Sequence, residues 1–155
     1  MSITEKLEAL GITLPTPAAP VANYVGYVRT GNLLVVSGQI AFGADGKIAA
    51  VHLGHLGASV SPADAHAAAR LCAINLLAQA KAALGSLDNI ERVVRLGGFV
   101  SCTPDFIAIP AVINGASDFM VEVLGDKGRH ARAAVGVPSL PLNCCVEVEA
   151  LFEIK

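Results

Sequence analysis

The chain has no tryptophan, only two tyrosines and five phenylalanines, and no run of lysine or arginine. Proteins that bind nucleic acids normally combine a basic surface with aromatic side chains that stack on bases. Here the formal net charge is −2 and the sequence pI is about 6.0. The composition therefore argues against a primary role on RNA or DNA, and we expect no nucleic-acid partner.

Charged residues of either sign are scarce. They make up 15% of the chain, against about 25% in a typical soluble domain, and hydrophobic residues make up 54%. A single sphere of this composition would expose a large apolar surface, and such patches usually mark subunit interfaces. We therefore expect an obligate homo-oligomer, with alanine richness as the alternative explanation of the low charge. Because 155 residues is the length of one ordinary domain, we expect a single domain over residues 1–155.

Cysteine patterns typical of metal sites are also missing. None of the four cysteines belongs to a CxxC pair. The adjacent Cys144 and Cys145 read most simply as small, buried apolar side chains. His52 and His55 are close in sequence, but no cysteine or further histidine completes a ligand spacing around them. We therefore expect no metal ion.

No targeting or membrane-spanning segment is recognisable. The first residues include Glu5, Lys6 and Glu8, where a signal peptide would be apolar. The longest apolar helical stretch, residues 71–84, is interrupted by polar and charged side chains. These features predict a cytoplasmic location without membrane contact.

Capping signals and periodicity predict an α+β domain behind a short N-terminal extension. A capping box at residues 2–5 begins a short helix, which Gly11 ends, and a proline-rich linker runs to residue 22. Longer helices are expected over residues 62–84 and 110–124. Strands are expected over residues 24–29, 33–37, 47–49, 92–102, 131–137 and 144–154. Two helices are too few to cover both faces of this sheet, so a second subunit should cover the other face.

Arg132 is the most unusual residue of the chain, because every other residue in the segment 131–137 is small or apolar. A buried guanidinium without a partner is costly and must find an acceptor. One interpretation is a salt bridge, or an arginine that faces water from an edge strand. The other is a bidentate clamp for a substrate carboxylate, which suits the fork geometry of arginine.

Other candidate site residues give weaker signals. Glu147 shares one face of the last strand with two further glutamates, which indicates a solvated face. It could also lie near Arg132 on a neighbouring strand and act as a general acid or base. Ser37 and Gly38 close a hairpin strand, where a glycine permits close approach of a ligand to the backbone.

Two further positions have a packing explanation beside a functional one. Tyr24 is expected to lie in a strand, where most tyrosines pack and keep a polar tip. Asn114 precedes Gly115 inside the second long helix, where glycine costs about 1 kcal/mol relative to alanine. This pair indicates either tight packing or a helical turn opened toward a ligand.

The order and spacing of these residues resemble the longer branch of the Rid/YjgF family. The resemblance extends from residue 24 to residue 154, nearly the whole chain. The matching residues are Tyr24, Gly31-Asn32, Ser37-Gly38-Gln39, Asp105-Phe106, Asn114, Ala131-Arg132, Leu140-Pro141 and the segment 146–150. Each motif is short, and it is their order and spacing together that make the resemblance specific.

The resemblance implies a chorismate-mutase-like fold, with a mixed sheet packed on two helices, and a homotrimer with clefts between subunits. It also implies hydrolytic deamination of small 2-enamine or 2-imine acids to 2-keto acids and ammonia, without a metal or organic cofactor. In that family the position of Arg132 holds the substrate carboxylate, and the position of Glu147 positions or activates water. The other positions that line the cleft are Tyr24, Ser37, Gly38 and Asn114.

The chain departs from the family at several points. Well-studied deaminases have Ser-Cys after the arginine, where this chain has Ala133-Ala134. The segment 124–130 is longer, and Ala22-Asn23 replaces a Gly-Pro that often precedes the tyrosine. These changes alter the pocket, so a non-catalytic trimer that binds small carboxylates is the alternative function. An endoribonuclease, a third possibility, is disfavoured by the acidic balance and the missing basic groove.

Overall fold

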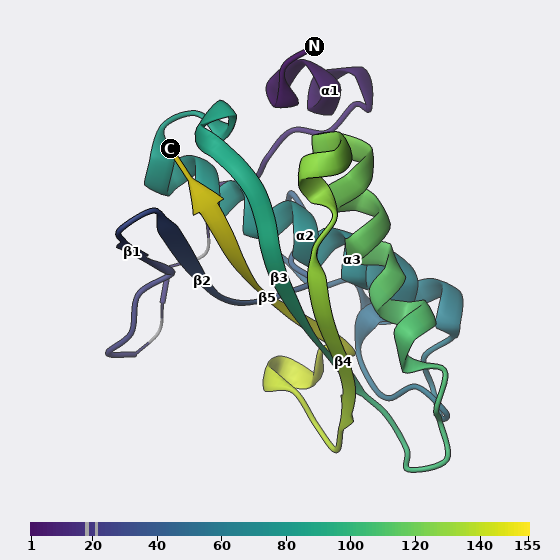
Figure 1. Cartoon of the computed structure of the whole chain (residues 1–155). Coiled ribbons are helices and arrows are strands. Elements are labelled where there is room, and N and C mark those ends of the chain that lie inside the picture. Colours follow the sequence, from purple (N-terminus) through teal and green to yellow (C-terminus); the bar gives the residue numbers. More distant parts are fainter. Residues whose placement is uncertain (18, 21) are drawn as a thin grey trace.

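A five-stranded mixed sheet forms the centre of the molecule (Figure 1). The computed structural model describes residues 1–17, 19–20 and 22–155. The strands are β1 (Tyr27–Thr30), β2 (Leu33–Ile40), β3 (Ile90–Ser101), β4 (Ala131–Val137) and β5 (Val146–Ile154). Their spatial order is β1-β2-β5-β3-β4, and all neighbours are antiparallel except β3 and β4, which are parallel. The last strand in sequence therefore lies in the middle of the sheet.

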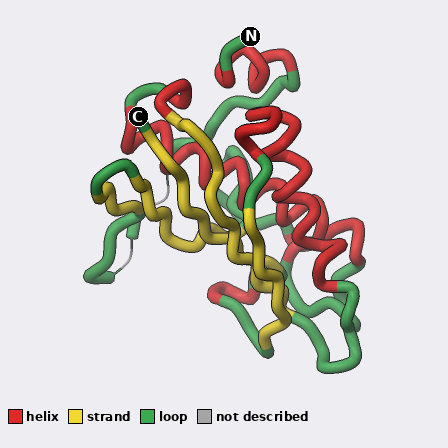
Figure 2. The backbone as a smooth tube through the Cα atoms, viewed as in Figure 1, coloured by secondary structure: helices red, strands yellow, loops and turns green. Residues whose placement is uncertain are grey.

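Two long helices, α2 (Pro62–Leu84) and α3 (Ile109–Leu124), lie side by side on one face of this sheet (Figure 2). The Ser61 side chain accepts from the backbone N–H of Asp64 and so caps α2, while Gly85 ends it in a left-handed conformation with φ 76°. α3 connects the parallel strands β3 and β4, as such a pair requires. The expected α+β fold, a mixed sheet on two helices, is confirmed.

Shorter helical elements complete the fold. The N-terminal helix α1 (Ile3–Ala9) has the expected capping box at Ser2 and Glu5. Four short 3-10 turns connect the larger elements: η1 (Ala50–His52), η2 (Leu87–Asn89), η3 (Gly125–Gly128) and η4 (Pro141–Asn143). Of these, η3 and η4 flank β4 in the sequence and carry or precede residues of the candidate site.

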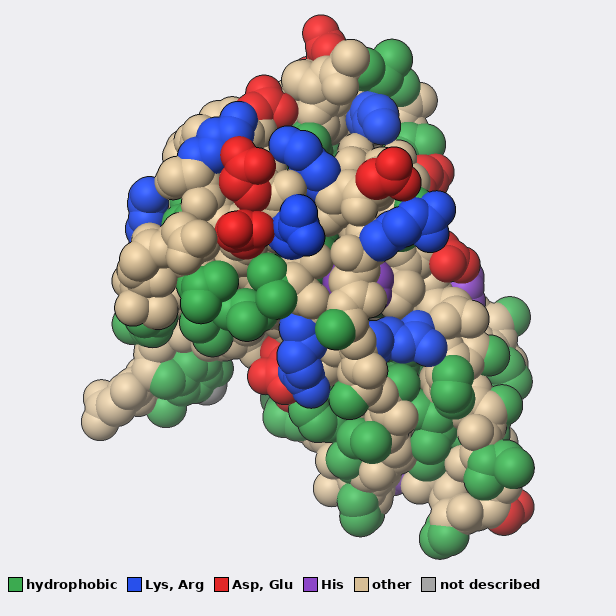
Figure 3. Space-filling view, viewed as in Figure 1, with side chains coloured by type: hydrophobic (Ala, Val, Ile, Leu, Met, Phe, Trp, Pro, Cys, Tyr) green, Lys and Arg blue, Asp and Glu red, His purple; other side chains and the backbone are tan. Residues whose placement is uncertain are grey.

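The strand β5 alternates between the two faces as predicted. Val146, Val148, Ala150, Phe152 and Ile154 are buried under the helices, and the residues between them are half-buried on the other face. On that other face Val28, Val35 and Leu151 form a row across three strands, in which Val28 and Val35 remain 51% and 45% exposed. Figure 3 shows this face toward the viewer, with apolar side chains gathered beside charged ones.

Three predicted strand boundaries were wrong. Tyr24 lies in the loop before β1, because the pairing of β1 with β2 ends at Tyr27 opposite Val36, where β2 begins to bulge. The strand expected at residues 47–49 is reduced to one bridge between Phe42 and Ile48 around a turn. β5 begins at Val146 rather than at residue 144, because Cys144 pairs instead with Leu53 in an isolated bridge.

Candidate functional site

Arg132 lies on the edge strand β4, and its side chain reaches the N-terminal half of α3. Nη1 donates to Oδ1 of Asn114 at 2.7 Å and to Oγ of Ser117 at 3.2 Å. Both acceptors are neutral. The arginines that form ion pairs within the described residues are Arg70, Arg92, Arg95 and Arg129. The salt-bridge interpretation of Arg132 is therefore wrong for the described part of a single chain, and its guanidinium is oriented without being neutralised.

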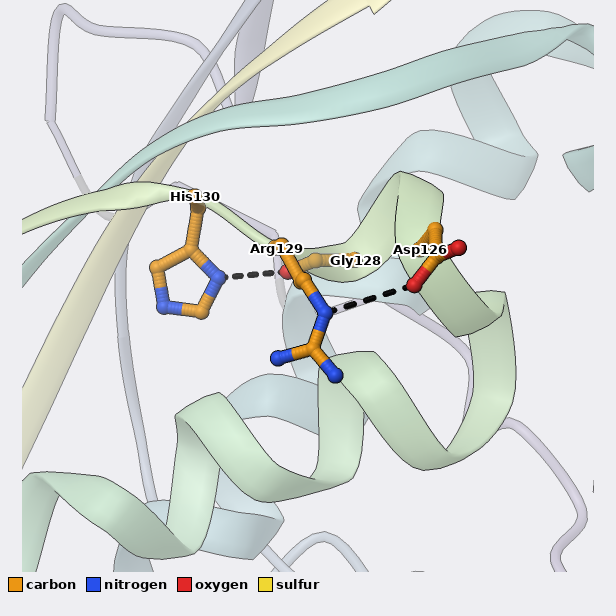
Figure 4. A network of polar contacts seen from close by, with 4 residues as sticks. All are labelled: Asp126, Gly128, Arg129 and His130. Atoms are coloured by element: carbon orange, nitrogen blue, oxygen red, sulfur yellow. Dashed lines mark hydrogen bonds and ion pairs between the residues drawn. The ribbon is translucent and has the colours of Figure 1, made fainter.

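The Ser117 hydroxyl is in turn oriented by His130. Nε2 of His130 lies 2.8 Å from Ser117 Oγ. Nδ1 lies 2.6 Å from the carbonyl oxygen of Gly128, and Figure 4 shows this second contact. A carbonyl only accepts, so Nδ1 carries the proton and Nε2 of the neutral ring accepts from the Ser117 O–H. The Ser117 oxygen then accepts from Arg132. Three side chains thus form one directed chain of hydrogen bonds.

The neutral form of His130 has a physical basis. Burial lowers the pKa of His130; the hydrogen bond to the Gly128 carbonyl opposes this, and the nearby positive charge of Arg132 lowers the pKa further. The turn η3 brings the ring to this place, and Gly128 fits there because a Cβ would lie only 2.2 Å from the Met120 carbonyl oxygen. The longer segment 124–130 noted in the sequence is this turn.

The remaining predicted residues line a pocket of about 320 Å³ formed by β2, the start of β5, and the segments before β1 and β5. Tyr24, Ser37, Gly38 and Glu147 all belong to its wall. Ser37 is held by two hydrogen bonds, from its hydroxyl to the Val25 carbonyl at 2.6 Å and from its N–H to the Gly26 carbonyl at 2.9 Å. The other lining residues are Ala19, Pro20, Gly26, Gln39, Ile40, Phe42, Gln79, Pro141 and Leu142.

Ser37 and Gly38 form a β-bulge directly beside Glu147. Val36 is paired with Ala150 and Gln39 with Val148, so β2 has one residue more than β5 in this interval. At Gly38 a Cβ would lie 2.8 Å from Oε2 of Glu147. The bulge therefore brings the backbone against the carboxylate, and only a glycine leaves the carboxylate its present place.

Glu147 is half-buried in this pocket, with consequences for its proton affinity. Burial raises the pKa of Glu147, and the neighbouring Glu149 carboxylate raises it further. Glu149 itself is 3.8 Å from Nη1 of Arg95, on the same open face. A carboxyl whose pKa is raised toward neutrality is suited to accept and return a proton.

The expectation that Glu147 could lie near Arg132 was wrong for a single chain. β3 lies between β4 and β5, and through it Arg132 aligns with Ala150 rather than with Glu147. Two strand spacings and three residues along the strand separate the Cα atoms by roughly 14 Å. The two side chains also point to opposite faces. The structure thus brings the predicted residues together as two groups, Arg132 with Asn114 and Glu147 with Tyr24, Ser37 and Gly38.

Three residues that support these groups were not predicted as site residues. Ser117 follows Asn114 by one helical turn, so both face Arg132, and this spacing was the available signal. His130 lies two residues before Arg132, but its role depends on the turn η3. Asn75 of α2 is buried and donates to the carbonyls of Ile40 and Phe42, both at 3.0 Å, which anchors one wall of the pocket.

The described residues contain no cluster of metal ligands and no helix that could span a membrane. No three or more His, Cys, Asp or Glu side chains there gather in an arrangement that could hold a metal ion. The four cysteines are free thiols, and Cys72, Cys144 and Cys145 are buried, as expected for small apolar side chains. None of the described helices has the length and apolar character to cross a membrane.

Comparison with known proteins gives consistent matches over nearly the whole chain. The family model "YjgF/chorismate mutase-like, putative endoribonuclease" matches residues 4–154. Protein TCP17 of Trypanosoma cruzi is 46% identical over 154 residues, which cover 99% of this chain and 94% of that protein. The crystal structure of Atu1372 from Agrobacterium tumefaciens, a protein of unknown function, has 51% identity and a TM-score of 0.91, covering 99% of this chain and 92% of that one. A Shewanella oneidensis protein described as a putative endoribonuclease has 35% identity and a TM-score of 0.94, covering 99% and 100%.

Proposed function

Because the chain belongs to the YjgF/chorismate mutase-like family, we propose that it hydrolyses small 2-enamine or 2-imine acids to 2-keto acids and ammonia. The observation that carries this proposal is the Arg132 guanidinium, held by two neutral acceptors and by no carboxylate of the described chain. Such a guanidinium matches the carboxylate that every substrate of this class contains.

In this proposal the two groups of residues meet in clefts between the subunits of a homotrimer. Each chain has Arg132 at one edge of its sheet and Glu147 on the opposite face, so neither group completes a site alone. In a closed ring every subunit gives one group to each of two neighbouring clefts. The apolar row of Val28, Val35 and Leu151 on the bare sheet face supports burial against another subunit.

The residues suggest a simple division of work. Arg132 binds the substrate carboxylate, and Asn114 and Ser117 fix the direction of its fork. An enamine first tautomerises to the imine. Glu147 then accepts a proton from water as the water oxygen forms a bond to the imine carbon. The same proton passes to the nitrogen and gives a carbinolamine. Glu147 then moves a second proton from the new hydroxyl to the nitrogen, the C–N bond breaks as the C=O bond forms, and ammonia and the keto acid leave.

The test uses imines made in the assay by an amino acid oxidase, with the rate of imine loss compared with and without the protein. We expect the protein to accelerate hydrolysis and Arg132→Ala to abolish the acceleration. Arg129→Ala is the matched control, because Arg129 is an exposed arginine nearby that forms an ion pair with Asp126. An unchanged rate with the wild-type protein would refute the deaminase proposal.

A non-catalytic carboxylate-binding trimer is the second candidate. It is favoured by one observation, the replacement of Ser-Cys by Ala133-Ala134 directly after the arginine. Calorimetry with 2-keto acids separates the two candidates. A binding protein would keep its affinity in Glu147→Gln, which retains the side-chain size, and would hydrolyse no imine.

A further inference from the structure

The pocket around Glu147 has a wall that hydrolysis of the imine does not itself require. Beyond the carboxylate it combines the polar side chains of Ser37, Gln39 and Gln79 with a group of apolar side chains, among them Ile40, Phe42 and Leu142. If the pocket served only to hold water beside Glu147, polar side chains would suit the apolar part of this wall better. The wall therefore raises the question of which part of a ligand it contacts.

Leu142 is the most informative residue of the wall. Its side chain is 68% exposed, and its backbone is left-handed, with φ 56° and ψ 21°. This conformation is unfavourable for leucine and is normally taken by glycine, asparagine or aspartate. The next residue, Asn143, is also left-handed, with φ 60°. A leucine that keeps a strained backbone conformation while its side chain is exposed indicates a functional role for that side chain, such as contact with a ligand.

The opposite part of the wall is fixed before any ligand arrives. Asn75, buried in α2, donates both hydrogens of its side-chain amide to the carbonyls of Ile40 and Phe42 at 3.0 Å. The backbone that carries these two apolar side chains is therefore tied to the helix layer. A preformed apolar surface binds an apolar group without the entropic cost of ordering its own chain.

The charge of the pocket also limits which substrate side chains it can bind. Among the described lining residues the one carboxylate is Glu147, and there is no lysine, arginine or histidine. An acidic side chain on the substrate would meet Glu147 without a compensating cation. An apolar side chain meets no such repulsion and gains from leaving water.

The size of the pocket points in the same direction. Its volume of about 320 Å³ is at the lower end of the range for small-molecule sites, about 300–1,000 Å³. At about 30 Å³ per water molecule it has room for on the order of ten waters. The methyl group of 2-iminopropionate would leave most of this space unfilled.

We propose that this pocket binds the side chain of 2-imine acids with large apolar side chains, such as those derived from leucine, methionine or phenylalanine. The proposal rests on the function proposed above and names its substrate class. The substrate carboxylate lies toward Arg132 of a neighbouring subunit, the imine carbon lies beside Glu147, and the side chain extends toward Ile40, Phe42 and Leu142.

The experiment measures kcat/KM for imines made in the assay from leucine, alanine and aspartate. We expect the leucine-derived imine to be preferred over the alanine-derived one by at least about tenfold, in line with pocket discrimination of added methylenes. The aspartate-derived imine should be the poorest substrate. Leu142→Asn keeps the left-handed turn, since asparagine tolerates it, and removes the apolar side chain. It should lower the leucine-to-alanine ratio about tenfold.

Val51→Asn is the matched control, because it makes the same chemical change at another exposed apolar residue, 55% exposed and outside the pocket. It should leave the ratio unchanged. If imines are hydrolysed but the alanine-derived one is preferred, or if Leu142→Asn keeps the full ratio, the side-chain pocket is refuted while the deaminase proposal stands.

A second measurement keeps the pocket testable if no imine is hydrolysed and the deaminase proposal fails. Calorimetry then compares 4-methyl-2-oxopentanoate with pyruvate. Binding of the branched acid at least about tenfold more tightly, with loss of that preference in Leu142→Asn, would support the apolar pocket. Equal affinities, or no binding of either acid, would refute it.

Discussion

Nε2 of His130 lies 2.8 Å from the Ser117 hydroxyl, and this contact decides which way the hydroxyl points. Because the ring holds its proton on Nδ1 toward the Gly128 carbonyl, Ser117 donates to His130 and has its lone pairs free for Arg132. A neutral, half-buried residue behind the site thus controls the direction of a half-buried cation. The geometry makes Ser117 and His130 positioning residues for Arg132, which act on a ligand only through that side chain.

The first prediction concerns Ser117→Ala, which removes one of the two acceptors of Arg132. A hydrogen bond to a charged group contributes about 1.5–3 kcal/mol, and part of it remains through Asn114 and water. We expect KM for imine substrates, or Kd for 2-keto acids, to rise about tenfold with a smaller change in kcat. Ser117→Thr keeps the hydroxyl and should restore the affinity. Asp118→Ala, an exposed change at the next position of α3, is the control.

The second prediction concerns the pH dependence of stability. The pKa of His130 is lowered in the folded chain from an ordinary value of 6.5, mainly by burial. Unfolded chains therefore bind more protons than folded ones in the window below pH 6.5, so His130 makes the fold less stable as pH falls through that window. Burial also lowers the pKa of His52, so His52 likewise makes the fold less stable as pH falls.

Thermal unfolding between about pH 5 and about pH 8 measures this effect. The Tm of the wild type should fall on acidification, and the Tm of the His130→Gln variant should fall less over the same pH window. His66→Gln, on the exposed surface of α2, should follow the wild type. Parallel curves for the wild type and His130→Gln would show that His130 is not held neutral by the fold.

Local chemistry made much of the fold predictable. α2 was recognisable because Ser61, Pro62 and Gly85 each act within one turn of a helix end. The two faces of β5 followed from strict alternation of side chains. The expectation for Gly115 was left open, and the structure decides it in favour of packing, since a Cβ there would lie 2.0 Å from the His66 carbonyl oxygen.

The arrangement of the site was less predictable, for physical reasons. No local pattern states that β5 pairs with β3 rather than with β4, and this pairing puts Arg132 and Glu147 on opposite faces. The bulge at Ser37 depends on the same long-range register. His130 contacts Ser117 of α3 only because the turn η3 places its ring there. Residue types were thus readable from the sequence, whereas their distances depended on contacts between remote segments.

The third prediction concerns Gly38→Ala, which places a methyl group where the Glu147 carboxylate now lies. A separation of 2.8 Å between Cβ and Oε2 is too short, so the carboxylate must move. We expect a loss of kcat of at least about tenfold, because misplacement of a catalytic group by about 1 Å costs up to about a hundredfold.

A double-mutant cycle with Glu147→Gln tests whether the two residues act through one group. Both changes disable the same carboxylate, so Gly38→Ala added to Glu147→Gln should lower kcat little further. If the fold-loss of kcat in the double variant equals the product of the two single losses, Gly38 has a role independent of Glu147. The Tm of both single variants, measured in parallel, separates an effect at the site from a loss of folded protein.

The last prediction concerns Asn75→Leu, which keeps the side-chain size but removes both bonds to the wall of the pocket. The carbonyls of Ile40 and Phe42 then lose these two bonds, and the Ile40 carbonyl keeps only the bond from the Phe42 N–H among the hydrogen bonds described for it. With about 1 kcal/mol for each bond, we expect a loss of about 2 kcal/mol and a fall in Tm of roughly 4–8 °C for a chain of this size. Because the same bonds fix the apolar wall, the variant should also discriminate less between leucine- and alanine-derived imines. A lower Tm with unchanged discrimination would mean that Asn75 stabilises the fold without shaping the pocket.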